Sequence, residues 1–179
     1  RSRLQAALRV IHPSLMTTAL DSEQFLAQSK CVCEAQPGGI ASYLAAGKNG
    51  SHWYSVREYV QGTTVEQLIQ QKGNVPPQRT LEIIQQIARQ LTVLHELRLC
   101  HGNLKPSNVI YRVGMSRLVD LAFGIPVARR ITGKDASESS RAFADYVAPE
   151  VIEASSTTDI RSDLYSLGCI WFELVTGQS

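Results

Sequence analysis

The stretch HGNLKPSN, residues 101–108, gathers several polar side chains into one short segment. Asn103 and Asn108 carry amides, and Lys105 lies between them with a cation. A carboxylate follows at Asp120, within the stretch VDLAFG. An amide orients a hydroxyl by hydrogen bonding, but it does not take up a proton near neutral pH. This combination favours orientation and charge neutralisation over proton abstraction.

Turn signals and hydrophobic periodicity predict the elements that position these residues. Short apolar runs predict strands, and helical spacing with capping residues predicts helices. The expected strands cover residues 4–11, 39–47, 52–60, 107–112 and 116–121. The expected helices cover residues 20–36, 63–73, a segment that opens at Pro76 and Pro77, and 162–177. The polar stretch 129–141 is expected to be a loop.

Three details of the helices are specific enough to test. The first helix is expected to be capped at Asp21 or Ser22. In the second, two capping boxes are open, one from Thr63 to Glu66 and one from Thr64 to Gln67. The buried faces of the last two helices are expected to carry Leu81, Ile84, Ile87, Ala88, Leu91 and Leu94, and then Leu164, Leu167, Trp171, Leu174 and Val175.

Strands dominate the first 60 residues and helices most of the remainder, which is typical of an α+β fold. We therefore expect a β-rich unit over residues 1–60 and a helical unit over residues 61–179. The boundary is expected near EYVQGTT, residues 58–64.

Composition bounds the function classes. The 179 residues are 44% hydrophobic and carry a net charge of +2, which is too weak to favour nucleic acid as a partner. No apolar run approaches the roughly 18 residues that span a bilayer. The four cysteines lack the spacing of a zinc site, so we expect buried thiols in a reducing compartment, the cytoplasm.

Four stretches in a fixed order resemble the protein kinase family, in particular bacterial-type Ser/Thr kinases. They are HGNLKPSN, VDLAFG, APE at residues 148–150 and DLYSLG at residues 163–168. Upstream, ALRVIHPSL and WYSVREYVQGTT are similar to the family's third strand and its hinge. The resemblance implies a two-lobe fold with a partial β-rich N-lobe and a partial helical C-lobe. It also implies that the chain is truncated at both ends.

The resemblance assigns a role to each residue of the opening motif. Asn103 occupies the position of the catalytic aspartate, and Lys105 the position that contacts the transferred phosphate. Asn108 and Asp120 match the metal ligands, although a second register puts Ala122 at the place of Asp120. His101 is expected to be a packed structural residue, Gly102 replaces an arginine, and Asp163 matches an aspartate that braces this loop.

The nucleotide side of the resemblance is altered as well. Arg9 occupies the position of the phosphate-gripping lysine. Gln28 occupies that of its glutamate partner, with Glu23 and Glu34 as alternatives. Arg57 lies just before the hinge residues Glu58 and Val60, where a cation should crowd the nucleotide pocket.

The pattern of changes predicts a function. Structural positions of the family remain, whereas chemical positions are altered together, so we expect a pseudokinase that serves as a scaffold or regulatory binding module for a protein partner. A weakly active Ser/Thr kinase acting on protein substrates is the alternative, and a fold with only chance similarity is a third. ATP and Mg²⁺ are expected to bind weakly or not at all. The last helix carries more apolar residues than one buried stripe needs, so these residues alone should self-associate.

Overall fold

The computed structural model describes residues 5–125, 143–153 and 159–178. Strands β1 (Ala6–Ile11), β2 (Tyr43–Asn49) and β3 (His52–Glu58) form one sheet beside helix α1 (Ala19–Ala35). Helices α2 (Val65–Lys72), α3 (Pro77–Glu96), α6 (Pro149–Glu153) and α7 (Ile160–Thr176) form the other part, with a small sheet of β4 (Thr63–Thr64), β5 (Val109–Arg112) and β6 (Met115–Leu118). Three short 3-10 turns cover Pro13–Leu15, Pro106–Asn108 and Ala144–Tyr146.

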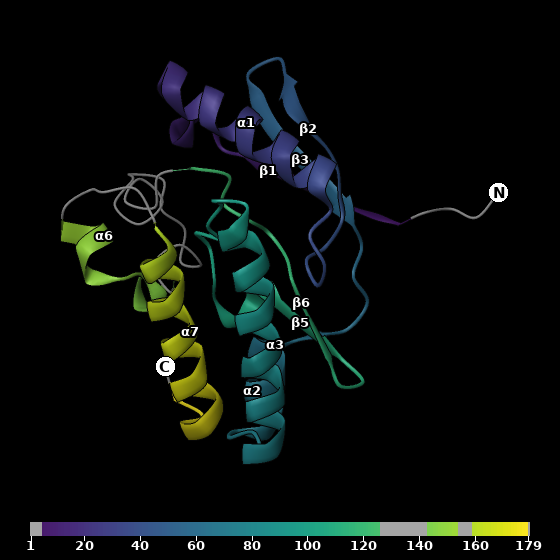
Figure 1. The fold of residues 1–179 in the computed structure, drawn as a ribbon, viewed down its shortest axis with the longest axis vertical. Coiled ribbons are helices and arrows are strands. Elements are labelled where there is room, and N and C mark those ends of the chain that lie inside the picture. The colour runs from purple at the N-terminus through teal and green to yellow at the C-terminus, as the bar shows by residue number, and fades with distance from the viewer. Residues whose placement is uncertain (1–4, 126–142, 154–158, 179) are drawn as a thin grey trace.

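Figure 1 shows the sheet and α1 stacked above the helical part, which confirms the expected α+β two-lobe architecture. The boundary between residues 60 and 61 stays a prediction, because backbone hydrogen bonds link the two parts. Ile40 forms a parallel bridge with Leu118, and Ala41 N donates to Leu118 O at 2.9 Å. The expected loop at residues 129–141 lies outside the described residues.

Strand β3 lies at the centre of the antiparallel sheet, in the order β1-β3-β2. Its register pairs Arg9 of β1 with Ser55, and Tyr43 of β2 with Arg57. Trp53 and Ser55 are buried, as expected for alternate positions of a strand with one covered face. The register therefore brings Arg9, Tyr43 and Arg57 together within one sheet.

Helix α1 begins earlier than expected. Thr18, and not Asp21 or Ser22, is the N-cap, and its Oγ1 accepts from Asp21 N at 3.1 Å. Asp21 returns the bond by accepting from Thr18 N at 2.8 Å. An acidic residue three positions after a threonine forms a reciprocal capping box, so Asp21 belongs inside the first turn.

Helix α2 selects one of the two open capping boxes. Thr64 Oγ1 accepts from Gln67 N, and Gln67 Oε1 accepts from Thr64 N, both at 3.0 Å. The alternative at Thr63 and Glu66 is wrong, because Thr63 pairs with Tyr111 in the small sheet.

Helices α3 and α7 pack against each other, and the expected faces are only partly correct. The buried apolar side chains are Ile83, Ile84, Ile87, Leu91 and Leu94 of α3, and Leu167, Ile170 and Leu174 of α7. Leu81 is 44% exposed. Leu164, Trp171 and Val175 are also about half exposed, so the buried stripe of α7 lies about one residue away from the expected one. The buried side of α7 also carries Asp163, which is 1% exposed.

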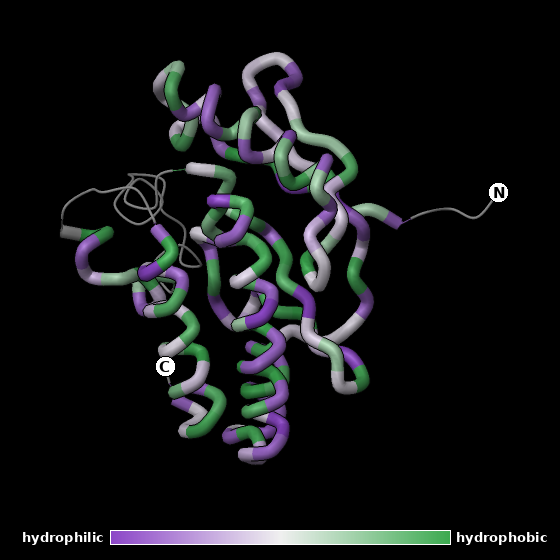
Figure 2. Tube along the Cα trace, in the orientation of Figure 1, coloured by the Kyte–Doolittle hydropathy of each residue, from purple (hydrophilic) through white to green (hydrophobic). Residues whose placement is uncertain are grey.

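The expected apolar surplus on the last helix is confirmed, since Phe172 is exposed as well. Figure 2 shows α7 as apolar over much of its length. Within the described ranges, no helix is both long enough and apolar enough to cross a bilayer. Self-association through this surface stays a prediction.

The core continues from the sheet into the segment after β6. Phe25 of α1 contacts Trp53 and Phe123 edge to face, with ring centroids 5.5 and 5.7 Å apart. Tyr43 contacts Phe123 at 4.8 Å. Such aromatic contacts add to apolar burial, so Phe123 anchors the segment that carries Asp120 beneath the sheet.

Candidate functional site

Asp163 of α7 holds the backbone of the segment 101–108. Its Oδ2 accepts from His101 N at 2.8 Å, and its Oδ1 accepts from Gly102 N at 2.9 Å. The carboxylate also lies 3.0 Å from His95 Nε2. The expected bracing role is thus confirmed, and Asp159 is the N-cap of α7.

His101 is a packed structural residue, as expected. Its side chain is completely buried, with Nε2 3.0 Å from Val119 O and Nδ1 3.3 Å from Asn103 N. Burial lowers the pKa of His101, so the neutral ring is favoured. In that tautomer Nε2 donates to the carbonyl and Nδ1 accepts from the amide.

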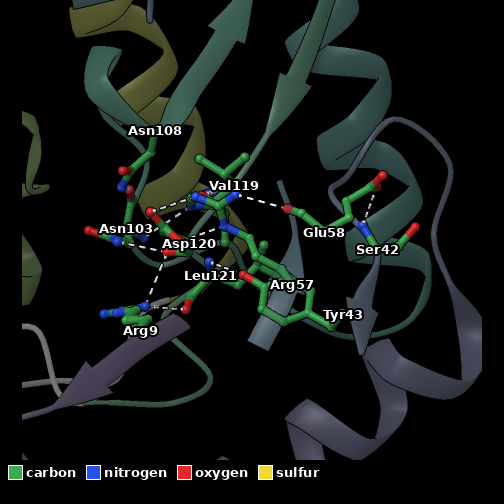
Figure 3. Close-up of polar contacts among 11 residues, drawn as sticks. Arg9, Ser42, Tyr43, Arg57, Glu58, Asn103, Asn108, Val119, Asp120 and Leu121 are labelled. Atoms are coloured by element: carbon green, nitrogen blue, oxygen red, sulfur yellow. Dashed lines mark hydrogen bonds and ion pairs between the residues drawn. The ribbon is translucent and has the colours of Figure 1, made fainter. Parts of the chain in front are cut away.

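The Asn103 amide is committed to the protein itself. Asn103 is 4% exposed, and its Nδ2 donates to the backbone oxygen of Asp120 at 2.7 Å. The backbone oxygen of Asn103 accepts from Asn108 Nδ2 at 2.7 Å. Figure 3 shows these side chains grouped around Asp120. A carboxylate at position 103 would have no hydrogen to give to the Asp120 carbonyl, so the amide is chemically specific here.

Asp120 forms an ion pair with Arg57. Arg57 Nε lies 2.9 Å from Asp120 Oδ1, and Arg57 Nη2 lies 3.4 Å from Oδ2 (Figure 3). Burial raises the pKa of Asp120, but the hydrogen bond and charge of Arg57 outweigh that effect and leave it lowered. Ala122 instead is buried, with its N–H donated to His101 O. Of the two candidate residues, Asp120 directs its side chain toward Arg57, whereas Ala122 is buried in the core.

Asp120 also adopts an unusual backbone conformation. Its φ of 61° lies in the left-handed region, which aspartate enters at a modest cost. The backbone is held there by bonds to its carbonyl oxygen, from Asn103 Nδ2 and from Arg9 Nη1 at 3.4 Å. Residues held in such conformations cluster at functional sites.

Arg9 forms no ion pair with Gln28 of α1, as the amide at that position implies. Its Nη1 donates to Leu121 O at 2.7 Å as well as to Asp120 O, and no hydrogen bond joins it to Gln28 within the described residues. Gln28 instead packs against Gly124: a Cβ atom added to Gly124 would lie only 3.1 Å from Nε2 of Gln28. The lysine–glutamate pair implied by the resemblance therefore has no counterpart at Gln28.

The two alternatives to Gln28 do not supply the partner either. Glu23 is exposed, and Glu34 lies 3.8 Å from Lys30 on the surface of α1. Arg9 thus reaches backbone carbonyls where the resemblance implies a carboxylate.

The hinge residues line a separate hollow. A cavity of about 620 Å³ is lined by Gln5, Glu58, Tyr59, Val60, Gln61, Ile110, Arg112, Met115 and Arg117. Glu58 accepts from Arg117 Nη2 at 2.6 Å and from Ser42 N at 2.7 Å. Burial raises the pKa of Glu58, but these bonds outweigh it and lower the pKa overall. Arg57 turns away toward Asp120 and is not among the residues that line this cavity.

Lys105 remains at the rim of the site. It is half-buried, and its Nζ lies 5.7 Å from the centre of the Phe143 ring, within range of a cation–π contact.

One site residue escaped the sequence analysis. Tyr43 is 2% exposed, and its hydroxyl accepts from Leu121 N at 2.9 Å. Burial raises the pKa of Tyr43 to about 12, so the phenol stays protonated. A tyrosine in a strand carries no local signal for this contact with a residue 78 positions away.

The residues assigned to the metal do not fit a divalent cation in this arrangement. Magnesium needs several oxygen ligands in near-octahedral geometry. Both carboxylate oxygens of Asp120 are engaged by Arg57, and a guanidinium cation repels a second cation at that distance. Asn108 alone would leave one neutral amide oxygen.

Comparisons with known proteins address the fold. A family model of the protein kinase domain matches residues 5–179. The serine/threonine-protein kinase PknB of Mycolicibacterium smegmatis is 35% identical over 133 residues, covering 73% of this chain and 21% of the relative. The serine/threonine-protein kinase pkn2 of Myxococcus xanthus is 29% identical over 184 residues, covering 97% of this chain and 21% of the relative. The chain thus spans about a fifth of the length of these curated relatives.

A solved structure agrees with the lobes in Figure 1. The crystal structure of the Mycobacterium tuberculosis PknI kinase domain superposes with a TM-score of 0.74. The two are 21% identical, and the match covers 96% of this chain and 62% of that one, so the likeness concerns the fold. The braced segment, its order relative to Asp120 and Asp163, and the matched family model agree, and the chain belongs to the protein kinase domain family.

Proposed function

We propose that this chain is a pseudokinase domain, which uses the kinase fold as a scaffold or regulatory binding module. The observation that carries the proposal is the state of Asn103. Its amide is buried and donates to the Asp120 carbonyl, so the catalytic position offers no group that accepts a proton from a hydroxyl. Loss of a general base lowers a rate by roughly 10²–10⁴-fold.

The charge arrangement supports the same conclusion. Phosphoryl transfer depends on metal ions and cations that neutralise the phosphates. Here the metal-ligand position Asp120 is paired with Arg57, and Arg9 is held by backbone carbonyls. We therefore expect Mg²⁺-dependent ATP binding to be weak or absent.

A protein is the partner that this proposal implies. The named relatives are serine/threonine-protein kinases, which supports a polypeptide as the binding partner. A scaffold needs a stable shape but no catalytic turnover. Here Arg9 and Arg57 of the sheet form hydrogen bonds with residues 120 and 121, which join the two lobes without a ligand.

A weakly active Ser/Thr kinase is the second candidate, transferring the γ-phosphate of ATP to protein hydroxyls. Lys105, Asn108 and Asp120 are all present, and this retention favours it. In that function Arg57 would have to leave Asp120 before metal could bind.

Transfer of labelled γ-phosphate by the full-length protein separates the two candidates. We expect no transfer to a generic basic protein substrate and no autophosphorylation with ATP and Mg²⁺ or Mn²⁺. A steady rate that the isosteric Asp120→Asn variant abolishes would establish the weak kinase, because a contaminating enzyme would not respond to that substitution. A rate that persists in Asp120→Asn belongs to a contaminant and leaves the pseudokinase proposal standing.

A further inference from the structure

The Arg57 guanidinium lies where a bound cation would have to lie. It is held 2.9 Å from one oxygen of Asp120 and 3.4 Å from the other, and its side chain is only 14% exposed. Its third nitrogen, Nη1, donates to the backbone oxygen of Glu58 at 3.2 Å. The geometry points to Arg57 as a built-in cation that keeps divalent metal away from a latent site at Asp120.

The rest of the latent site remains in place beneath Arg57. The side-chain nitrogen of Asn108 donates to the backbone oxygen of Asn103, and the side-chain oxygen of Asn108 accepts no hydrogen bond within the described residues. The Asp120 side chain is 30% exposed, so water and ions reach it once Arg57 is gone. Carboxylate and amide oxygens with water are the ligands that Mg²⁺ and Mn²⁺ accept.

Tethering explains why Arg57 excludes a free ion. A group fixed to the same chain acts at an effective concentration of roughly millimolar or more, and it is present at all times. Magnesium loses its water shell reluctantly, so it competes poorly for a carboxylate that is already neutralised. Arg57 therefore also makes the arrangement of the side chains around Asp120 independent of metal.

This inference deepens the proposed function, since a binding module with a permanent internal cation needs no cofactor to hold its shape. It predicts a gain that follows from one substitution. In Arg57→Met, the charge is removed while an unbranched apolar side chain remains. The full-length variant should bind an additional equivalent of Mn²⁺, measured by electron paramagnetic resonance and competed by Mg²⁺. Its melting temperature should rise by about 5–10 °C at a metal concentration about 100-fold above Kd.

Matched variants isolate the cause. Arg57→Met combined with Asp120→Asn should lose the additional equivalent, and Arg57→Lys, which keeps a cation, should not gain it. Arg9→Met removes the same charge from the same cleft but leaves Asp120 paired, so it should not gain the site either. If Arg57→Met does not fold, Arg57→Gln makes the same test, because its amide still donates to Asp120 without a charge.

Two results would overturn the inference. One is a folded Arg57→Met or Arg57→Gln protein that binds no more metal than the wild type. The other is a wild-type protein whose bound Mn²⁺ is already lost on Asp120→Asn. Phosphoryl transfer by the wild type with ATP and Mg²⁺ would overturn the proposed function, whereas the role of Arg57 is judged separately, by metal titrations made without nucleotide.

Discussion

Reversion of Asn103 to the aspartate of active kinases should destabilise this protein. The Asn103 amide donates to the Asp120 carbonyl at 2.7 Å in a site that is 4% exposed. In Asn103→Asp the donor becomes a carboxylate oxygen of the same size, facing a carbonyl oxygen. The variant loses a hydrogen bond of about 1 kcal/mol and places a buried carboxylate oxygen against the Asp120 carbonyl, which keeps only the 3.4 Å bond from Arg9 Nη1; this costs about 1–2 kcal/mol more. We expect a total loss of about 2–3 kcal/mol in the free energy of unfolding.

Urea denaturation at several pH values tests both the size and the cause of this loss. With a slope of about 2 kcal/mol per molar urea, the midpoint should fall by roughly 1 M at pH 7. The new carboxyl group should have a raised pKa in the folded state, because only its protonated form donates to the carbonyl. Its penalty should therefore be small below the unfolded pKa of about 3.9 and grow as the pH rises through the folded pKa.

Asn49→Asp is the control, because Asn49 is exposed at the end of β2. It should change the free energy of unfolding by less than about 0.5 kcal/mol. A midpoint of Asn103→Asp equal to the wild type at pH 7 would refute the reasoning, and so would a deficit that does not shrink in acid. The variant should also gain no phosphoryl transfer, because Arg57 would still pair with Asp120.

Two further predictions concern the contacts that hold the site. Because the pKa of Asp120 is lowered, its pair with Arg57 stabilises the fold above the unfolded carboxyl pKa, and this contribution is lost as the pH falls through the folded pKa. The urea midpoint of the wild type should therefore fall more between pH 5 and 3 than that of Asp120→Asn. An equal fall in the two urea midpoints would contradict this. Asp163→Ala leaves two buried backbone N–H groups without an acceptor and should lower the free energy of unfolding by about 2–4 kcal/mol by denaturant titration, whereas the exposed Asp145→Ala should change little; equal effects would argue against the bracing role.

The parts of the fold that sequence predicted well rest on local signals. A threonine with Glu or Gln three residues later predicts a capping box at the start of α2, at Thr63 or Thr64, and α3 shows a sustained helical period. The segment 101–108 and its bracing by Asp163 were expected because motif order carried information beyond any single stretch. The expected buried face of α7 was wrong because the helix carries apolar residues on all sides, so periodicity does not select one face. The face that points inward also carries Asp163, which bonds to the backbone of residues 101 and 102.

The partners of the charged residues could not be read from local pattern. Arg57 meets a carboxylate 63 positions away, and Arg9 meets a carbonyl 112 positions away. The resemblance places both arginines in the nucleotide site and predicts that Arg57 crowds the pocket, but it gives no sign that Arg57 pairs with Asp120. Whether Arg9 and Arg57 point toward residues 120 and 121 depends on the strand register and on the φ of Asp120. Hydrophobic periodicity reveals neither.

The altered residues depend on one another in a way that explains why they occur together. A half-buried carboxylate at Asp120 without metal would be costly if unpaired, and a mostly buried Arg57 would be costly without an anion. Their pair removes both costs, and the neutral amide of Asn103 avoids adding a second carboxylate beside Asp120. Reverting any one position therefore exchanges a satisfied group for an unpaired one. Because residues in one charge network are not additive, a variant that both reverts position 103 and removes Arg57 should not show the sum of the two single effects on stability.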